Sequence, residues 1–470
     1  MENRESTVKL KDIHRVYFIG AGGIGMSALA RWFNQRGQEV AGYDRTATVL
    51  TSRLEAEGMA LHFADDISLV PAAFREDKAH TLVVFTPAVP QRHTELNWFR
   101  DNGFTVMKRS ELLGLITQNH FTVAVAGTHG KTTTSSIIAH LLCYAEAEMV
   151  AFLGGIAANY SSNLVLSGTG PAEQQQVVVE ADEFDRSFLR LFPNIGVVTS
   201  ADPDHLDIYG DADSLRNSFA DFVGQVNKEG MVFLHDSIAD DLSSRTAFAG
   251  RQIRYGIDRG ELRAERVQVV EGAFCFDLVW ADRRMEQVEM PLPGFHNVEN
   301  ALVALAVGLE LGIDEDMLRK GLAAYKGVKR RFEFVLREEG RVFIDDYAHH
   351  PREIAALLRS VRTLYPEQKA TVIFQPHLYS RTNDFAEGFA EILAEADDLI
   401  LLPIYPAREE PMPGVTSQML IDKMQEPRGQ VMSKEEAIAY VRAAKPSLLL
   451  TVGAGDIDAQ VVKLKEALTQ

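Results

Sequence analysis

Short apolar runs recur along the chain, and each one ends in glycine or polar residues before a helical pattern begins. Residues 121–126 form such a run, and residues 137–142 then place apolar side chains three and four positions apart. The same alternation recurs in HRVYFIG, EVAGYD, TLVVF, VVVEAD, IGVVTS, RVFIDD, TVIFQP, LILLPI and LLLTVG. Strands that alternate with helices predict α/β domains whose polar groups gather at the ends of parallel strands.

The length of 470 residues predicts three domains, at roughly 150 residues for each. A first strand–turn–helix series ends near residue 110, and a new series begins after a basic segment near residue 328. We therefore expect domains at residues 1–110, 111–327 and 328–470.

The composition is that of a soluble globular protein, with 46% hydrophobic and 24% charged residues. A net charge of −18 argues against nucleic acid and anionic membranes as partners, so an anionic substrate must meet local positive groups. The two cysteines, Cys143 and Cys275, make a disulfide framework improbable. No apolar signal segment or membrane span is visible, and we expect a cytoplasmic protein without membrane insertion.

The segment AGTHGKTTT has the composition of a phosphate-binding loop between a strand and a helix. Backbone N–H groups from Gly127 to Lys131 can surround an anion, Lys131 can reach terminal phosphates, and Thr132 can offer its hydroxyl to Mg²⁺. The usual pattern has a glycine at the position of Val125, and here Gly127 comes two residues later. A strand-to-helix turn without a ligand is the alternative.

A second glycine turn, GAGGIG, places Gly20, Gly22 and Gly25 directly after a strand. This spacing allows a diphosphate to approach the backbone, and Asp44 at the end of the next strand can reach a ribose hydroxyl. Thr86 lies at the same predicted edge. NAD, a UDP-sugar and a turn without a ligand all remain open on these residues alone.

Acidic residues follow two further strands of the predicted central domain. Glu180 ends the run VVVE, and His205 lies between two aspartates in DPDHLD. Carboxylates at strand ends beside a phosphate loop are natural magnesium ligands, and a neutral histidine can hold a second metal ion. A solvated acidic face and a structural histidine are the alternatives.

Polar and basic residues also surround the start of a strongly apolar helix and the predicted seam before residue 328. Asn297 and Asn300 share one helix face, which suits either capping of the helix or recognition of a base edge. Arg330 and Arg331 can neutralise a phosphoryl group, or they belong to a basic linker. A phosphate loop, a second phosphate turn and a third α/β domain together favour ATP-driven amide or ester formation over simple hydrolysis.

Seven motifs in a fixed order resemble one known family. AGTHGKTTT, EADEFD, DPDHLDIYG, GFHNVENA, RRFE, DDYAHHP and QPHLYSRT resemble the Mur ligases of bacterial cell-wall synthesis over essentially the whole chain. The resemblance implies an N-terminal Rossmann-like domain that binds a UDP-sugar, a central P-loop ATPase-type α/β domain and a C-terminal Rossmann-like domain. GAGGIGMSALA, DDYAHHP and VGAGDI further resemble the members that add L-alanine.

The implied activity is an ATP-dependent amide ligation of L-alanine to UDP-N-acetylmuramate through an acyl phosphate, giving ADP and phosphate. This reaction serves peptidoglycan precursor synthesis and therefore cell-wall biogenesis, cell shape and cell division. The implied cofactor is Mg²⁺, with ATP as co-substrate, and the expected assembly is a monomer or a weak homodimer.

The resemblance also implies a role for each matching residue. Catalytic roles fall to Lys131, Glu180, His205 and Arg331, and the metal ligands are Thr132, Glu180 and His205. The expected ATP contacts are Gly127, Thr128, His129, Gly130, Lys131, Thr132, Thr133, His296, Asn297, Arg331, Asp345 and His349. The expected UDP-sugar contacts are Gly20, Gly22, Gly23, Ile24 and Gly25, together with the sheet-edge residues Asp44 and Thr86. The expected amino-acid contacts are Tyr347, His377 and Arg381.

Three features depart from the family pattern. Residues 210–227 contain no lysine, so we expect a magnesium shell without the carbamoylated lysine of several relatives. The segment GMALHFADD lacks a Gly-His pair that many alanine-adding members carry on the uracil side. Leu378 stands where many relatives have arginine, and Arg381 is the substitute candidate for holding the amino-acid carboxylate.

Three other functions compete with this interpretation. A recycling ligase that joins a preformed tripeptide to UDP-N-acetylmuramate would share both phosphate sites. An NAD-dependent oxidoreductase would explain residues 20–44 but not the phosphate loop. A nucleotide-dependent switch would not need the N-terminal glycine turn.

Overall fold

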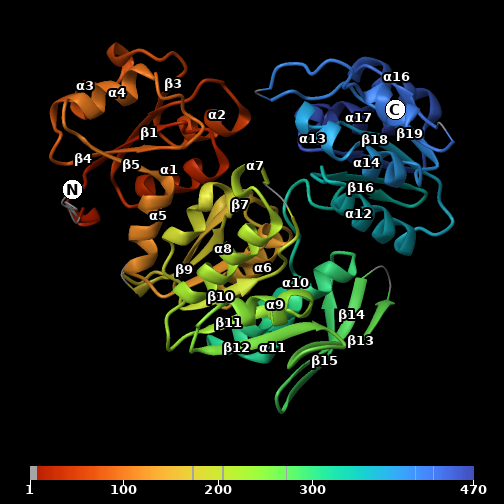
Figure 1. Ribbon diagram of the computed structural model, residues 1–470, viewed down its shortest axis with the longest axis horizontal. Helices are drawn as coiled ribbons and strands as arrows, with labels where there is room; N and C mark the ends of the chain where they lie inside the picture. The colour runs from red at the N-terminus through yellow and green to blue at the C-terminus, as the bar shows by residue number, and fades with distance from the viewer. Residues whose placement is uncertain (1–7, 172–173, 204–205, 271–272, 408, 427) are drawn as a thin grey trace. The chain divides into compact units, whose positions relative to one another are not determined.

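The structure is a computed structural model that describes residues 8–171, 174–203, 206–270, 273–407, 409–426 and 428–470 (Figure 1). The chain divides into two compact units. The first unit comprises Met1–Arg266, Phe276–Val288 and Glu299–Tyr325, and the second comprises Val267–Cys275, Glu289–Val298 and Lys326–Gln470. Three sheets organise these residues.

The first sheet has five parallel strands in the order β3-β2-β1-β4-β5. They are β1 (Arg15–Ile19), β2 (Glu39–Tyr43), β3 (Ala60–His62), β4 (Thr81–Phe85) and β5 (Thr105–Lys108). The accompanying helices are α1 (Ile24–Gln35), α2 (Val49–Ala56), α3 (Ala72–Glu76), α4 (Thr94–Asp101) and α5 (Arg109–Gln118).

Both faces of this first sheet are covered, which explains why its central strand is apolar at nearly every position. In β1, Val16 and Phe18 join the core that contains residues of α1 and α5. Tyr17 and Ile19 face the opposite core, which contains residues of α3 and α4. Successive side chains of a strand point to opposite faces, so a two-sided parallel sheet needs a continuous apolar run.

The second sheet has ten strands in the order β15-β14-β13-β12-β11-β10-β6-β9-β7-β8, and Figure 1 shows part of this order from β7 through β9, β10 and β11 to β12. Its strands are β6 (Thr122–Ala126), β7 (Met149–Ala157), β8 (Ser162–Ser167), β9 (Gln176–Ala181), β10 (Ile195–Val198), β11 (Met231–His235), β12 (Arg251–Ile257), β13 (Leu262–Val270), β14 (Ala273–Trp280) and β15 (Arg283–Met290). Strand β6 lies between β9 and β10 and is parallel to both. This position brings the ends of both neighbours to the turn that follows β6.

The helices of this region are α6 (Lys131–Tyr144), α7 (Leu206–Tyr209), α8 (Ala212–Gln225), α9 (Asp236–Arg245), α10 (Phe295–Glu310) and α11 (Glu315–Ala323). A short 3₁₀ segment, η4, spans Phe184–Arg190. Helix α6 is buried along most of its length, including its polar residues Thr134 and Ser135. The helix that begins at the phosphate loop is therefore a core helix.

The third sheet, in the second unit, has six strands in the order β16-β17-β21-β18-β19-β20. They are β16 (Glu333–Glu338), β17 (Arg341–Asp346), β18 (Ala370–Phe374), β19 (Asp398–Leu401), β20 (Gln430–Val431) and β21 (Leu448–Val452). Strand β16 is antiparallel to β17, and the remaining pairs are parallel.

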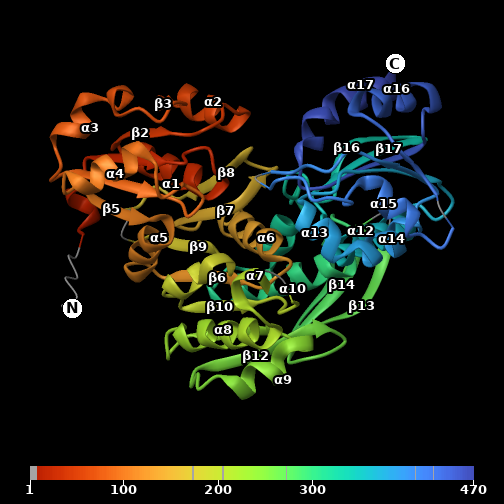
Figure 2. The same cartoon turned by 45° about the horizontal axis from the view of Figure 1, so that its top comes forward.

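Helices cover both faces of the third sheet (Figure 2). The helices are α12 (Pro351–Leu364), α13 (Tyr379–Asp384), α14 (Ala386–Leu393), α15 (Ser417–Asp422), α16 (Lys434–Ala444) and α17 (Val461–Thr469). Val342 and Ile344 of β17 pack with residues of α12, α14 and α15, whereas Phe343 packs with residues of α16 and α17. Strands with two covered faces again account for the apolar runs read from the sequence.

The predicted α/β class with three sheet-based domains is confirmed. The predicted boundary at residue 110 falls inside α5, whose Leu112 and Ile116 belong to the core of the first sheet. The boundary at residue 327 falls between α11 and β16. Among the described residues, no helix combines the length and apolar character needed to cross a bilayer.

Candidate functional site

The predicted phosphate loop is a tight turn between β6 and α6. Strand β6 continues to Ala126, and Val125 is fully buried in it, so a glycine at 125 has no part in the turn. The turn begins at Gly127, which has a φ of +130°, and Gly130 has a φ of +83° before α6 starts. Glycine adopts such angles without steric cost.

Two residues after β10 hold this loop, and neither was predicted from the sequence. The hydroxyl of Ser200 accepts the N–H of His129 at 2.8 Å and lies 2.9 Å from the hydroxyl of Thr128. Thr199 donates its hydroxyl to the carbonyl of His129 and leaves no room for a Cβ at Gly127. The signal that could have found them is the adjacency of β10 and β6, which places Thr199 and Ser200 beside the loop.

Lys131 folds back over the loop instead of extending from it. Its Nζ donates to the carbonyl of Gly127 at 2.5 Å and lies 2.8 Å from Oε2 of Glu183. Burial alone lowers the pKa of Lys131, but the carboxylates of Glu183 and Asp182 outweigh burial and raise it. Lys131 is therefore a charged ammonium paired with a carboxylate that is only 1% exposed. Glu183 was not among the predicted site residues.

The hydroxyl of Thr132 and the carboxylate of Glu180 lie together at the start of α6. Thr132 donates to Oε2 of Glu180 at 3.0 Å, and Ser135 donates to Oε1 at 3.3 Å. The N–H of Gly154 also donates to Oε1, at 2.5 Å. Glu180 lies within β9, one residue before its end. A hydroxyl and a carboxylate are the hard oxygen donors that Mg²⁺ prefers, so this pair fits the predicted metal site.

His205, the third predicted metal ligand, lies outside the described residues. Its role as a ligand and as a catalytic residue stays a prediction. Asp202, a few residues earlier, contacts the loop, because its N–H donates to the hydroxyl of Thr128 at 3.1 Å. His129 Nε2 lies 3.7 Å from the carboxylate of Asp202.

Most N–H groups of the glycine turn after β1 already donate hydrogen bonds within the protein. Gly20 and Ala21 donate to the carbonyl of Tyr43, Gly23 donates to Gly20, and Gly22 donates to Oδ2 of Asp44 at 2.8 Å. Asp44 thus supports the turn directly, a contact that the sequence analysis did not predict. Its other oxygen accepts the N–H of Thr46 at 3.1 Å.

Three further predicted residues lie at this turn. Ile24 and Gly25 begin α1, whose first N–H groups have no partner inside the helix. Thr86 follows β4, and its Cγ2 would be 2.8 Å from a Cβ at Gly20. The structure therefore brings the predicted UDP-sugar residues together at the carboxyl ends of β1, β2 and β4. Their contact with a ligand stays a prediction.

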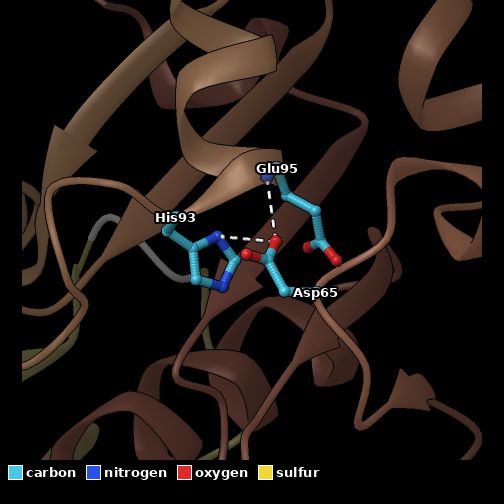
Figure 3. A group of neighbouring side chains, drawn as sticks. All are labelled: Asp65, His93 and Glu95. Carbon is cyan, nitrogen blue, oxygen red and sulfur yellow. Dashed lines mark hydrogen bonds and ion pairs between the residues drawn. The ribbon is translucent and has the colours of Figure 1, made fainter.

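A polar cluster beside the first sheet, which we define as Asp65, His93 and Glu95, has an exposed Asp65 and a buried His93 and Glu95 (Figure 3). Asp65 accepts the N–H groups of Thr94 and Glu95 at 2.8 and 3.1 Å. Its Oδ1 lies 3.2 Å from Nδ1 of His93. These donors are of the types that bind metal ions, but the hydrogen bonds already explain how the oxygens of Asp65 are placed.

Glu95 in this cluster is fully buried beside a phenol. It accepts the hydroxyl of Tyr17 at 2.6 Å and the N–H of Asp66 at 3.1 Å. Burial raises the pKa of Glu95 to about 7, although both hydrogen bonds oppose the shift. The cluster thus joins β1, the segment after β3 and the start of α4 through a carboxyl group that titrates near neutrality.

In the second unit, His296 and Asn297 lie in the first turn of α10. The side-chain amide of Asn297 donates to the carbonyl of Pro293 at 2.6 Å. The ring of His296 would lie 2.5 Å from a Cβ at Gly294, which has a φ of +107°. The amide of Asn297 therefore bonds the chain that enters the helix, and recognition of a base edge stays a prediction.

Two predicted ATP contacts, Arg331 and Asp345, lie at the start of the third sheet region. Asp345 pairs with Nε of Arg330 at 3.3 Å and accepts the hydroxyl of Thr451 at 2.6 Å. Burial raises the pKa of Asp345, and Arg330 opposes that shift. The guanidinium of Arg331 lies 6.0 Å from the ring centre of Tyr347. Arg330, considered from the sequence with Arg331 as a residue that can neutralise a phosphoryl group, was not given a site role by the family resemblance.

The predicted amino-acid residues lie at the ends of β17 and β18. His349 and His377 have ring centres 6.3 Å apart, and Nη1 of Arg381 is 3.3 Å from Nδ1 of His377. Burial lowers the pKa of His377 to about 4, and Arg381 adds to the shift. Burial also lowers the pKa of His349. Both imidazoles are therefore neutral at pH 7, and Nδ1 of His377 accepts a hydrogen bond from Arg381.

Leu378, flagged as a departure from the family pattern, has an unusual backbone conformation. Its φ is +69°, in the region that side chains other than glycine rarely adopt. Its N–H donates to the carbonyl of Tyr405 at 2.9 Å, which fixes the chain just before α13. The strained residue thus sets the direction of the helix that carries Arg381.

Comparison with known proteins decides the family. The description "Mur ligase family, catalytic domain" matches residues 15–121, "Mur ligase middle domain" matches residues 125–308, and "Mur ligase, glutamate ligase domain" matches residues 330–455. A UDP-N-acetylmuramate–L-alanine ligase of Flavobacterium johnsoniae is 45% identical over 463 residues, which cover 98% of this chain and 100% of the relative. The chain belongs to the Mur ligase family.

Solved structures of Mur ligases have the same fold. The UDP-N-acetylmuramate–alanine ligase of Thermotoga maritima has a TM-score of 0.79 and 27% identity, over 97% of this chain and 99% of that chain. A murein peptide ligase of Psychrobacter arcticus has a TM-score of 0.71 and 22% identity, over 97% and 98%. The three-domain α/β architecture of this Mur ligase is therefore that of its family.

Proposed function

We propose that this Mur ligase joins L-alanine to the carboxylate of UDP-N-acetylmuramate with consumption of ATP, giving ADP and phosphate for peptidoglycan precursor synthesis. The observation that carries the proposal is the 45% identity over 98% of the chain to a ligase of that name. The local geometry supports it, because a buried ammonium, a hydroxyl and a carboxylate meet at a strand–turn–helix phosphate loop.

Lys131 is the residue that we assign to the phosphates of ATP. Its ammonium stays charged because Glu183 and Asp182 raise its pKa, so it can neutralise charge on the transferring phosphoryl group. The N–H groups at the start of α6 would meet the same phosphates. The contacts of Thr199 and Ser200 keep this turn preformed, which lowers the cost of ordering it on binding.

We assign Mg²⁺ to Thr132 and Glu180, with His205 as the further predicted ligand. The hydroxyl and carboxylate are already 3.0 Å apart and present oxygen donors. When bound, Mg²⁺ would neutralise charge on the phosphate oxygens. Ser135 and the N–H of Gly154 hold the carboxylate of Glu180 in place for this role.

The proposed chemistry has two steps. A carboxylate oxygen of UDP-N-acetylmuramate forms a bond to the γ-phosphorus of ATP while the bond from that phosphorus to the leaving oxygen of ADP breaks. The amine of L-alanine then attacks the carbonyl carbon, and phosphate leaves with the electrons of the broken carbon–oxygen bond. The nitrogen loses its extra proton to the medium, which completes the amide.

The other predicted residues keep the roles that the family resemblance implies. The UDP-sugar is assigned to the turn of Gly20 to Gly25, with Asp44 and Thr86. In the second unit, the ATP contacts are assigned to His296, Asn297, Arg331, Asp345 and His349, and the amino-acid contacts to Tyr347, His377 and Arg381. The neutral state of His377 at pH 7 means that its ring adds no positive charge to the proposed amino-acid site.

A recycling ligase that adds a tripeptide is the second candidate. A murein peptide ligase shares the fold at 22% identity, whereas the alanine-adding relative is 45% identical along its whole length. L-alanine is therefore favoured as the acceptor. The two candidates differ in the third substrate alone.

Phosphate release from ATP in the presence of UDP-N-acetylmuramate tests the proposal. We expect release with L-alanine, little release with the tripeptide and none without an acceptor. Chelation of Mg²⁺ by EDTA should abolish release, and added Mg²⁺ should restore it. Release with tripeptide alone would select the recycling ligase, and no release with either acceptor from folded protein would reject both.

We also propose a cytoplasmic location and a monomer or weak homodimer. ATP and the sugar nucleotide are cytoplasmic metabolites, and both Cys143 and Cys275 are free thiols, which suits a reducing compartment. Sedimentation of the purified chain at several concentrations would measure its assembly state.

A further inference from the structure

Arg109, the first residue of α5, lies against the glycine turn that follows β1. A Cβ built on Gly25 would be 2.5 Å from Nη1 of Arg109 and 3.4 Å from its Cδ. Gly25 is a helical residue of α1 with an ordinary φ, so its lack of a side chain serves this close approach and not a special backbone angle. The guanidinium therefore occupies the space next to the first turn of α1.

The guanidinium of Arg109 has N–H donors that make no hydrogen bond within the described part of the chain. Its side chain is 26% exposed, and Nη2 lies 3.6 Å from Oδ2 of Asp182, which is an ion pair but too long for a hydrogen bond. Within the residues that the structure describes, the side chain of Arg109 makes no hydrogen bond. A guanidinium carries five N–H donors in a fixed planar fork. A partly buried fork without acceptors indicates a ligand that brings them.

The glycine turn itself has few donors left for an anion. Gly20, Ala21, Gly22 and Gly23 all donate their N–H groups within the turn or to the end of β2. The chain carries a net charge of −18, so a phosphorylated ligand at this turn gains nothing from the overall field. Arg109 supplies a positive charge at the place where the turn lacks donors.

We infer that Arg109 binds the diphosphate of the sugar nucleotide at the glycine turn. This inference rests on the proposed function and adds to it a binding residue about 80 positions away from the turn in sequence. The planar fork matches the oxygens of a phosphate in a bidentate contact. Asp182 holds the guanidinium toward the turn before the ligand arrives.

The contact with Asp182 also places Arg109 next to the residues assigned to ATP. Asp182 lies two positions after Glu180, and its neighbour Glu183 pairs with Lys131. Lys108 repeats the arrangement, with Nζ 3.7 Å from Oδ2 of Asp185. One acidic segment, residues 182–185, therefore pairs with cations from both phosphate sites.

Binding of UDP, measured by calorimetry without ATP, tests the inference apart from catalysis. We expect Arg109→Gln to weaken UDP binding about 10- to 100-fold, as loss of a charged hydrogen bond does. Arg109→Lys should keep part of the affinity, because the charge remains but the fork is lost. Arg15→Gln is the matched control, since Arg15 is 21% exposed and ion-paired at the opposite end of β1. It should bind UDP within about twofold of the wild type.

Uridine serves as the ligand without phosphate. Its binding should be equal in the wild type and in Arg109→Gln. UDP binding by Arg109→Gln as tight as that of the wild type would overturn the inference and leave the proposed function intact. An equal loss for uridine and UDP would also overturn it, because Arg109 would then support the fold and not the diphosphate. A folded wild type that binds no UDP would overturn the proposed function together with the inference.

Discussion

The carboxyl edges of the first and second sheets carry similar glycine turns, but they obtain their positive charge differently. In the phosphate loop, Lys131 stands inside the motif and folds back onto Gly127. At the first turn, the nearby cation is Arg109, which the chain supplies after four more strands of the sheet. A compact motif can thus carry its own cation, whereas an open one takes its cation from elsewhere in the fold.

The buried glutamates beside the two edges differ in the same way. Glu183 is paired with an ammonium, while Glu95 faces the phenol of Tyr17. A cation compensates a buried carboxylate, but a neutral hydroxyl compensates it only in part. The pKa of Glu95 accordingly rises to about 7. The second sheet therefore keeps a charged pair at its edge, and the first keeps a proton-binding group.

The largest expected effect comes from removing the charge inside the motif. Lys131→Ala should lower the rate of ATP-dependent phosphate release roughly 1,000-fold, because one preorganised donor to developing charge is lost. The UDP affinity should stay unchanged, since Lys131 lies at the start of α6 in the phosphate loop and not at the glycine turn after β1. Single-turnover rates and UDP calorimetry measure the two quantities. A variant that loses both phosphate release and UDP affinity would show that the phosphate loop and the glycine turn after β1 do not act separately.

Alanine at one glycine of each turn should change stability in opposite directions. Gly127→Ala introduces a Cβ against Thr199 at a φ of +130°, and we expect a loss of about 3 kcal/mol in the free energy of unfolding. Gly25→Ala replaces a helical glycine beside a flexible arginine end, so stability should stay equal or rise by up to about 1 kcal/mol. Urea unfolding compares them. Equal losses of unfolding free energy in the two variants would mean that both turns are equally rigid toward an added Cβ.

A smaller effect, on stability and not on rate, is expected when the partner of Lys131 is replaced. Glu183→Gln should lower the free energy of unfolding by roughly 2 kcal/mol at pH 7, because a buried ammonium loses its carboxylate. The folded-state pKa of Lys131 is raised, so the contribution is present below its unfolded pKa of about 10.4 and is lost as pH rises through the folded value. Denaturation at pH 8 and near pH 11 should show the difference shrinking; a constant difference would contradict the pairing.

Glu95 should show a pH dependence of the same sign in a lower pH range. Its pKa is raised from 4.5 to about 7 in the folded chain, so the wild type loses stability as pH rises through that range. Glu95→Gln cannot ionise, and its stability relative to the wild type should therefore be greater at pH 8 than at pH 4.5, by roughly 3 kcal/mol. Melting temperatures across this range measure the shift. A flat relative stability would mean that Glu95 ionises as freely as an exposed glutamate.

The smallest effect is expected at the support of the first turn. Asp44→Asn removes the charged acceptor for the N–H of Gly22 but keeps an amide oxygen, so stability should fall by only about 1 kcal/mol. UDP affinity measured in parallel separates this role from a ribose contact. A loss of affinity much larger than the loss of stability would support the ribose contact predicted from the sequence.

The sequence predicted both turns because their signals are local. Strand β6, the turn and α6 lie in one continuous segment, and so do β1, its glycines and α1. Val125 was interpreted as a deviation from the loop pattern, and the structure shows that the strand simply extends through it. Apolar runs and glycine spacing are sufficient to locate such units.

Contacts between distant segments were missed for the opposite reason. Ser200 meets Thr128 across 72 positions, and Glu183 meets Lys131 across 52. Arg109 was not singled out, because nothing near it in the sequence resembles a phosphate site. Such residues become visible only once the strand order is known. The predicted role of His205 falls outside the described residues and stays a prediction.

The central position of β6 in its sheet has a consequence for the order in which the nascent chain is completed. Thr128 leaves the ribosome 72 residues before Ser200, and Thr134 leaves 166 residues before Asn300, to which its hydroxyl donates at 3.0 Å. Until those later segments emerge, the turn lacks the side chains that hold it. The growing polypeptide therefore cannot form its nucleotide pocket early, and ATP can stabilise the fold by binding only after most of the second sheet has been synthesised.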